Sequence, residues 1–202
     1  MVWEYISDPD VDDLDKFLEG WGIPATGYVM PCFYSYRKPI SKYLRKFTDK
    51  TREYRIFEFG TGRSTKQIAD YFIKNNIQFT IHTFENWVGY ANALKFNISN
   101  IVIHPIASQT VEEIYTCIKT IGWENNVDFA FIDMDMAGIM DVRAKILAFM
   151  KGYVKKDGYV VFHDIERQIP AHFAGWKIID HHNTDWEGSW RPHVETYVLV
   201  QP

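Results

Sequence analysis

The sequence is poor in cysteine, with only Cys32 and Cys117 among 202 residues. Two thiols are too few for a disulfide framework and lack the spacing of a metal site, so we expect buried thiols in a reducing compartment. Long apolar runs are also missing. The longest uncharged stretch, residues 20–36, is broken by two prolines and three glycines, whereas a membrane helix needs about 20 apolar residues. The acidic start shows no signal peptide, and we predict a cytoplasmic protein without membrane contact.

Strong charge of either sign is missing as well. The 22 Lys and Arg residues against 26 Asp and Glu residues give a formal net charge of −4, and no basic block gives a strong nucleic-acid signal. A hydrophobic content of 47% excludes a disordered chain. Aromatic residues are abundant at 16%; we expect most of them in the core, while some could line a pocket or the interface of a homo-oligomer.

The length predicts one domain. Residues 11–19 have the pattern of a short helix, residues 21–36 that of an aromatic loop, and residues 39–48 that of a helix with Lys and Arg on its outer side. We therefore divide the chain into a helical and aromatic extension, residues 1–50, which is a candidate lid, and an α/β domain, residues 51–202.

Strands and helices alternate regularly in the second part. Apolar runs predict successive strands at residues 55–59, 79–84, 101–103, 127–132 and 159–162, and a closing antiparallel pair at 176–180 and 194–200. Helices are predicted between the first five strands, beginning at a Ser64–Gln67 capping box, at residues 88–96, at a Thr110–Glu113 capping box and at residues 139–151. This alternation predicts right-handed βαβ units and a mostly parallel sheet with helices on both faces.

A glycine turn follows the first predicted strand, within Glu58-Phe59-Gly60-Thr61-Gly62-Arg63-Ser64-Thr65. Glycines let the backbone turn sharply and pass close to a ligand, and the start of the next helix exposes N–H groups. The turn is not a P-loop, and it lacks the third glycine of a dinucleotide fingerprint. It predicts a ligand-binding turn, with a purely structural tight turn as the alternative.

Polar residues follow three other strands at the same edge of the predicted sheet, where ligands bind in such folds. Glu85 and Asn86 follow the second strand, and a carboxylate there can accept both hydroxyls of a ribose. The residues after the fourth and fifth strands are Asp133, Asp135, His163 and Asp164. This group could orient a nucleophile, remove its proton or hold a hard cation, unless the acids only cap the segments that follow.

The segment Glu58–Thr65 resembles motif I of class I S-adenosylmethionine-dependent methyltransferases, in the E-x-G-x-G-x-S-T variant of small family members. The similarity continues through Phe79–Leu94, Val127–Asp133 and Asp157–Arg167, in the order of that family. The resemblance implies a Rossmann-like, doubly wound, mostly parallel seven-stranded sheet with an antiparallel last strand. It also implies S-adenosyl-L-methionine as the cofactor.

Site residues follow from this resemblance. It implies that the methionine moiety lies near Glu58 and the Gly60–Gly62 turn, and that the ribose lies at Glu85. It also implies that the adenine lies near Ala107 and Ser108. Asp133 is expected to face the sulfonium and the acceptor. The complete set of implied cofactor-binding residues is Glu58, Gly60, Thr61, Gly62, Ser64, Thr65, Glu85, Asn86, Ala107, Ser108 and Asp133.

The expected activity is methyl transfer to an oxygen or nitrogen of a small-molecule or sugar-like acceptor. We predict His163 as the general base, because an imidazole exchanges protons near neutral pH, with Asp164 orienting it or binding a cation. Catechol-type O-methyltransferases bind magnesium at similar places, but no lysine follows Asp133 within the next few residues, where that subgroup carries its base, and magnesium rarely chooses imidazole. We therefore favour an enzyme without a metal. The alternative is an inactive methyltransferase-fold binding or scaffold protein.

Overall fold

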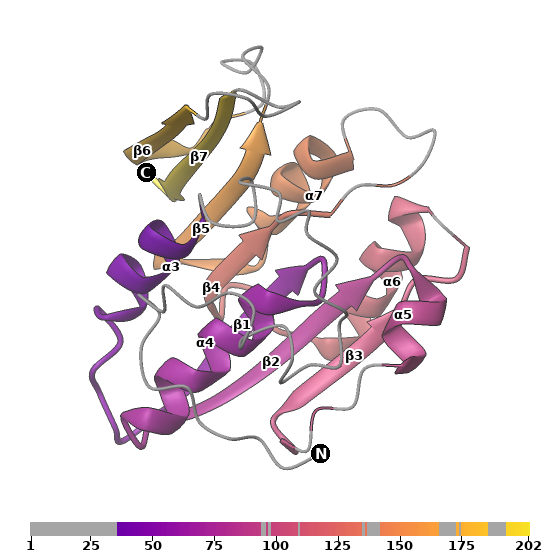
Figure 1. Ribbon diagram of the computed structural model, residues 1–202, viewed down its shortest axis with the longest axis horizontal. Helices are drawn as coiled ribbons and strands as arrows, with labels where there is room; N and C mark the ends of the chain where they lie inside the picture. The colour runs from indigo at the N-terminus through magenta and orange to yellow at the C-terminus, as the bar shows by residue number, and fades with distance from the viewer. Residues whose placement is uncertain are drawn as a thin grey trace.

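A computed structural model describes residues 36–93, 96, 98–108, 110–134, 136, 142–165, 173, 175–185 and 193–202. Its strands are β1 (Glu53–Phe59), β2 (Gln78–Glu85), β3 (Ile101–Pro105), β4 (Val127–Ile132), β5 (Val154–Ile165), β6 (Lys177–Asp185) and β7 (His193–Val200). In the described part of the chain they form one seven-stranded sheet in the order β3-β2-β1-β4-β5-β7-β6 (Figure 1).

The first five strands pair in parallel, whereas β7 runs antiparallel to both of its neighbours, β5 and β6. The predicted Rossmann-like sheet with its antiparallel last strand is therefore confirmed. The strand order reverses between β1 and β4, so the carboxyl ends of these two strands mark the edge where ligands bind in such folds.

The fifth strand begins five residues before the predicted start at Tyr159. The polar sequence Lys155-Lys156-Asp157-Gly158 reads as a turn, yet it belongs to β5. Two tertiary contacts explain the difference: Lys155 forms an ion pair with the buried Asp128, and Gly158 lies so close to β4 that a Cβ atom there would be 2.8 Å from the Val127 carbonyl oxygen. Partners on the neighbouring strand override the local turn preference.

Helices cover both faces of the sheet. They are α3 (Arg37–Leu44), α4 (Arg63–Lys74), α5 (Val88–Ala93), α6 (Val111–Ile121) and α7 (Val142–Met150). One apolar cluster joins α3 and α4 to one face, and a second joins α6 and α7 to the other. Among the described residues, no helix is both long and apolar enough to span a membrane.

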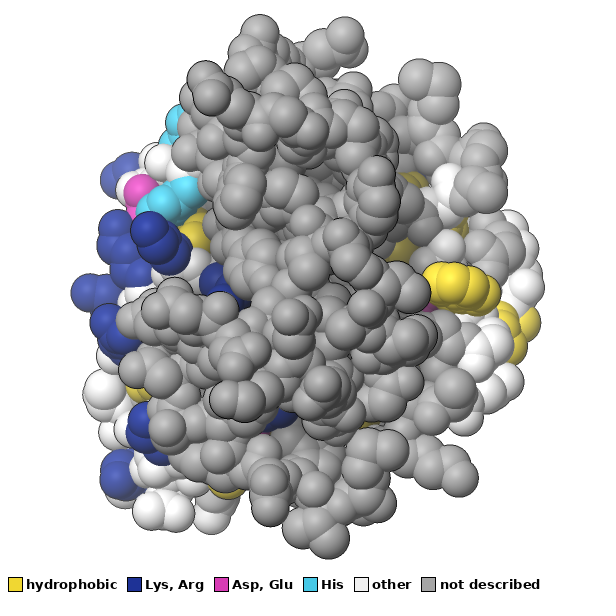
Figure 2. Space-filling model, in the orientation of Figure 1, with side chains coloured by type: hydrophobic (Ala, Val, Ile, Leu, Met, Phe, Trp, Pro, Cys, Tyr) yellow, Lys and Arg dark blue, Asp and Glu magenta, His cyan; other side chains and the backbone are white. Residues whose placement is uncertain are grey.

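Helix α3 lies in the described part of the predicted extension, residues 36–50, and it packs into the domain core. Tyr36, Ile40 and Leu44 are buried in the same cluster as Ile56 of β1. Lys and Arg side chains gather on the opposite, outer flank, as predicted (Figure 2). The predicted helix at 11–19 and loop at 21–36 fall on residues outside the described ranges, apart from Tyr36, so the lid remains a prediction.

The predicted Ser64–Gln67 capping box is wrong. The N-cap of helix α4 is Gly62, two residues before the predicted N-cap Ser64, and the Thr65 hydroxyl accepts the Gly62 N–H at 2.8 Å. The Ser64 hydroxyl instead donates to Glu58, and the Gln67 amide donates to α3. Both side chains of the expected box are therefore used by tertiary contacts that the local pattern does not contain.

Candidate active site

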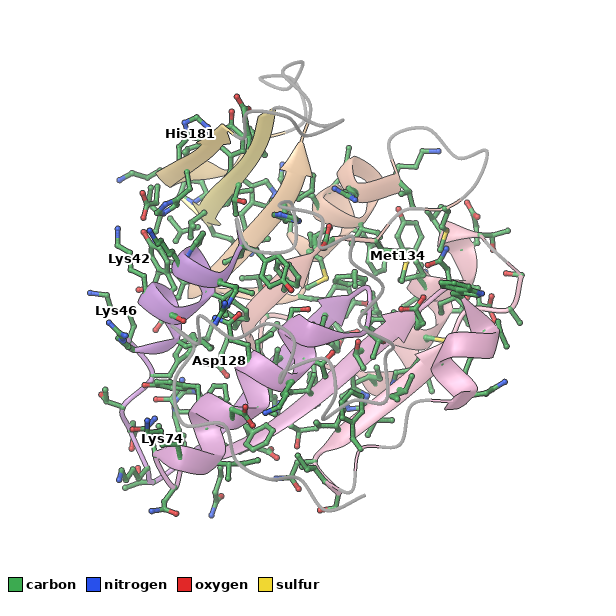
Figure 3. The ribbon with its side chains drawn as sticks, viewed as in Figure 1. Lys42, Lys46, Lys74, Asp128, Met134 and His181 are labelled. Carbon is green, nitrogen blue, oxygen red and sulfur yellow. The ribbon has the colours of Figure 1, made fainter. Side chains whose placement is uncertain are left out.

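The turn after β1 and the ends of β2 and β4 are joined by backbone hydrogen bonds. The Gly60 N–H donates to Phe84 O, and the Asp133 N–H donates to Phe59 O, both at 2.9 Å. Met134, labelled in Figure 3, marks the edge where β4 ends. The structure thus brings the predicted glycine turn, Glu85 and Asp133 to one edge of the sheet.

Gly60 holds the turn directly against the end of β4. Its φ of +96° lies in the left-handed region, which side chains disfavour. A Cβ atom at this position would lie 2.9 Å from the Asp133 carbonyl oxygen. Only glycine therefore fits, and the position of the turn is coupled to that of Asp133.

Glu85, at the end of β2, fastens the next residue of the turn. Its Oε2 accepts the Thr61 N–H at 2.9 Å and its Oε1 accepts the Trp87 N–H at 2.8 Å. Burial raises the pKa of Glu85 above its ordinary value, although these amide bonds act in the opposite direction. The Asn86 N–H also bonds to this carboxylate. Because two carboxylate oxygens offer about four acceptor positions, about one position remains for a ribose hydroxyl.

Glu58, in contrast, lies behind the turn. It is 0% exposed, and its two oxygens accept the hydroxyls of Ser64 and Thr65, each at 2.5 Å. Burial outweighs these bonds and a further one from Thr83, and raises the pKa of Glu58 to about 7.

A pH-dependent stability follows for Glu58. Because the pKa of Glu58 is about 7 in the folded protein and near 4.5 for an ordinary glutamate, the folded state binds more protons between these two pH values. The free energy of unfolding should therefore fall as pH rises through this window, by up to ~1.4 kcal/mol per pH unit from this group. The difference in unfolding free energy between wild type and Glu58→Gln, measured in urea from pH 4.5 to 8, should show this slope. A constant difference would contradict it.

The predicted adenine residues lie beside Glu85, since the Ile106 N–H donates to Glu85 O at 2.8 Å. Ala107 and Ser108 follow directly and are exposed. Ser108 donates through its N–H and hydroxyl to Glu113, at 2.7 and 2.6 Å, so this glutamate does not complete the predicted Thr110–Glu113 box. Only the Thr110 half of that box is confirmed, with its hydroxyl accepting the Glu113 N–H at 3.3 Å.

Trp87 is a candidate binding residue that the sequence analysis missed. Its side chain is 72% exposed, and its backbone amide is held by Glu85. An exposed indole beside Glu85 offers a flat apolar surface for an aromatic ring. The high aromatic content was a general signal, but it did not indicate which ring reaches the surface. Asn86, half-buried, lies between these two residues.

His163 and Asp133 are in contact at the ends of β4 and β5. The Nδ1 atom of His163 lies 2.9 Å from Oδ1 of Asp133. The imidazole is 2% exposed and has the Tyr36 ring edge-on at 5.1 Å, whereas the Asp133 side chain is 24% exposed. Asp135 lies outside the described residues, and so does the side chain of Asp164.

Arg143 of α7 joins these two strand ends and was not found from the sequence. Its guanidinium lies 3.3 Å from Oδ1 of Asp133 and donates to the His163 carbonyl oxygen at 2.6 Å. An arginine within a predicted amphipathic helix reads as a solvated side chain, so no local signal marks it. Asp133 thus lies between a guanidinium and an imidazole.

Metal binding has no further support in the described ranges. There, no group of three or more His, Cys, Asp and Glu side chains is arranged to hold a metal ion. Metal independence stays a prediction, to be tested with a chelator.

Solved structures share this fold. An O-methyltransferase from Bacillus cereus in complex with SAH has 13% identity and a TM-score of 0.60, covering 93% of this chain and 89% of the other. A SAM-dependent methyltransferase from Anabaena variabilis has 13% identity and a TM-score of 0.54, covering 100% of each. The 1,6-didemethyltoxoflavin-N1-methyltransferase of Burkholderia thailandensis has 11% identity and a TM-score of 0.51, covering 93% and 86%.

Sequence comparison gives the family. No match is found among curated protein sequences. A family model described as "Methyltransferase domain" matches residues 57–165, which is more than half of the chain and includes the glycine turn, Glu85, Asp133 and His163. The chain therefore belongs to the methyltransferase domain family, as its resemblance to class I S-adenosylmethionine-dependent methyltransferases indicated.

Proposed function

We propose that this protein transfers a methyl group from S-adenosylmethionine to an oxygen or nitrogen atom of a small-molecule or sugar-like acceptor. The proposal rests on one observation: the Thr61 N–H of the glycine turn donates a hydrogen bond to Glu85. Both residues lie within the segment that the family model matches. The O- and N-methyltransferases among the structural neighbours are consistent with either acceptor atom.

The residues at this edge fit such a cofactor. Glu85 provides carboxylate oxygens for the ribose, and Trp87, Ala107 and Ser108 provide the neighbouring surface for the adenine. The Gly60–Gly62 turn allows close approach of the backbone, and Asp133 provides negative charge for a cationic sulfonium. When bound, S-adenosylmethionine supplies an electrophilic methyl group whose bond electrons remain on sulfur after transfer.

The protein's own contribution at the acceptor end is orientation and proton acceptance. Holding an acceptor in line with the methyl group supplies much of the rate, and a base needs only to relieve the acceptor of its proton. Because Asp133 is more exposed than His163, we assign the acceptor contact to Asp133 and proton uptake to His163, through the 2.9 Å contact at Nδ1. Asp164 follows His163 on β5 as its proposed orienting residue.

Cofactor binding tests the proposal directly. Isothermal titration calorimetry should detect binding of both S-adenosylmethionine and S-adenosylhomocysteine, because the turn and Glu85 form one connected unit. Thermal shift assays with the same ligands provide an independent readout. Neither heat nor a thermal shift at millimolar ligand would contradict the proposal and favour the scaffold alternative.

Glu85→Ala should weaken S-adenosylhomocysteine binding by about 1–3 kcal/mol, the range for losing charge-assisted hydrogen bonds to a buried partner. The fold should persist, because Glu85 ends its strand. The exposed Glu112 on α6 provides the control, and Glu112→Ala should bind like wild type. Unchanged affinity in Glu85→Ala would mean that the ribose is bound elsewhere.

A further inference from the structure

A chain of hydroxyl groups connects the Gly60–Gly62 turn to Glu58. The Thr65 hydroxyl accepts the Gly62 N–H at 2.8 Å, so its own proton is directed to Oε2 of Glu58, 2.5 Å away. The Ser64 hydroxyl donates to the other oxygen, Oε1, at 2.5 Å. A side chain that accepts from two hydroxyls at once suits a carboxylate, which offers only acceptors when ionised.

A second branch reaches the other part of the turn. The Thr83 hydroxyl bonds to Glu58 and lies 2.7 Å from the Thr61 hydroxyl. The Thr61 N–H is in turn held by Glu85. Glu58 thus reaches Gly62 through Thr65, and reaches Thr61 and Glu85 through Thr83. The side chains of this network are all buried, at 0% to 7% exposure.

We infer that Glu58 is a positioning residue, which holds the Gly60–Gly62 turn in place through buried hydroxyl groups and does not contact the cofactor. The inference rests on the proposed function and deepens it, because it replaces the cofactor contact that the family resemblance implies for Glu58. Complete burial removes this carboxylate from a ligand's reach, and both of its oxygens already accept hydrogen bonds inside the protein. The turn is held in one geometry before the cofactor arrives, which reduces the ordering cost of binding.

Thr65 provides the sharpest test, because it belongs to the network and its hydroxyl is bonded on both sides within the protein. Thr65→Val keeps the shape but removes the hydroxyl, whereas Thr65→Ser keeps the hydroxyl. Calorimetric titration with S-adenosylhomocysteine at pH 8 should show about 10-fold weaker binding for Thr65→Val, the scale of one lost buried hydrogen bond. Thr65→Ser should remain within about 3-fold of wild type.

Thr83 tests the second branch in the same way, with a matched variant that separates loss of the hydroxyl from a folding defect. Thr83→Val should also weaken S-adenosylhomocysteine binding several-fold, with Thr83→Ser restoring it, and circular dichroism checks that each variant is folded. In a double-mutant cycle, Glu58→Gln and Thr65→Val should weaken binding by less than the product of their separate effects, since both act through one hydrogen-bond path.

The outcomes separate the two proposals. If wild type binds S-adenosylhomocysteine but folded Thr65→Val and Thr83→Val bind equally well, the positioning role is wrong and the proposed function stands. The inference is also wrong if the loss of S-adenosylhomocysteine affinity in the Glu58→Gln, Thr65→Val double variant equals the product of the two separate losses. If wild type itself binds neither S-adenosylmethionine nor S-adenosylhomocysteine, the proposed function fails, and the inference fails with it.

Discussion

Gly60→Ala should weaken S-adenosylhomocysteine binding by about 100-fold or more. The added Cβ atom would lie 2.9 Å from the Asp133 carbonyl oxygen, and the backbone would keep a φ of +96° that alanine disfavours. Strain of this kind costs about 1–3 kcal/mol, and the contact with backbone atoms adds to it. Because Gly60 and Asp133 lie at the same edge, relief of the clash must move the turn, the end of β4, or both. Calorimetry gives the affinity, and urea denaturation gives the accompanying loss of stability.

Gly89 provides the matched control for this substitution. It lies in α5, and a Cβ atom there would have no atom of the described residues within 4 Å. Gly89→Ala should therefore leave S-adenosylhomocysteine affinity unchanged and stabilise the helix slightly, by about 0.5–1 kcal/mol. Wild-type affinity in Gly60→Ala would show that the turn tolerates a side chain and does not approach the cofactor closely.

Asp128→Ala should lower the free energy of unfolding by about 3 kcal/mol. This carboxylate of β4, labelled in Figure 3, is 1% exposed. It forms ion pairs with Arg52 and Lys155, each at 2.5 Å, and accepts the Arg55 N–H at 2.9 Å. Breaking a buried ion pair costs about 3–5 kcal/mol, and we expect the lower end because both cations retain some access to water.

Asp157 is the control for Asp128, since it also lies near the Lys155 ammonium, at 3.6 Å, but is 82% exposed. Asp157→Ala should change the unfolding free energy by less than about 1 kcal/mol, as is usual for exposed pairs. Both variants should bind S-adenosylhomocysteine like wild type at low temperature, because Asp128 lies near the start of β4, away from the site edge. Equal stability losses in the two variants would contradict the buried role of Asp128.

Local patterns were sufficient to predict the sheet. Mostly apolar runs such as Val127–Ile132, in which Asp128 is the one charged residue, are buried on both faces as central strands are, and their alternation with helices limits the topology. The same reasoning placed the glycine turn, Glu85 and Asp133 at one edge, because parallel strands bring their carboxyl ends together. Local signals failed where a distant partner competes, as at Gln67, whose amide bonds to α3, and at the polar start of β5.

The roles of individual side chains depended on burial and on partners far away in the chain. Glu58 and Glu85 are both acids at the ends of neighbouring strands, yet the first is enclosed by three hydroxyls and the second lies beside the exposed Trp87. Arg143 reaches Asp133 only because α7 packs beside β4 and β5.

The sequence by itself determined the fold class and the edge that carries the site, since these follow from hydrophobic periodicity and from glycines and acids at strand ends. Its motifs indicated the family by resemblance. Only the tertiary structure decided that Glu58 faces the interior, that Asp133 lies between Arg143 and His163, and that Gly60 contacts the end of β4. The physical reason is that hydrogen bonding and desolvation depend on which atoms surround a group in space. Most of those atoms come from other elements of the chain.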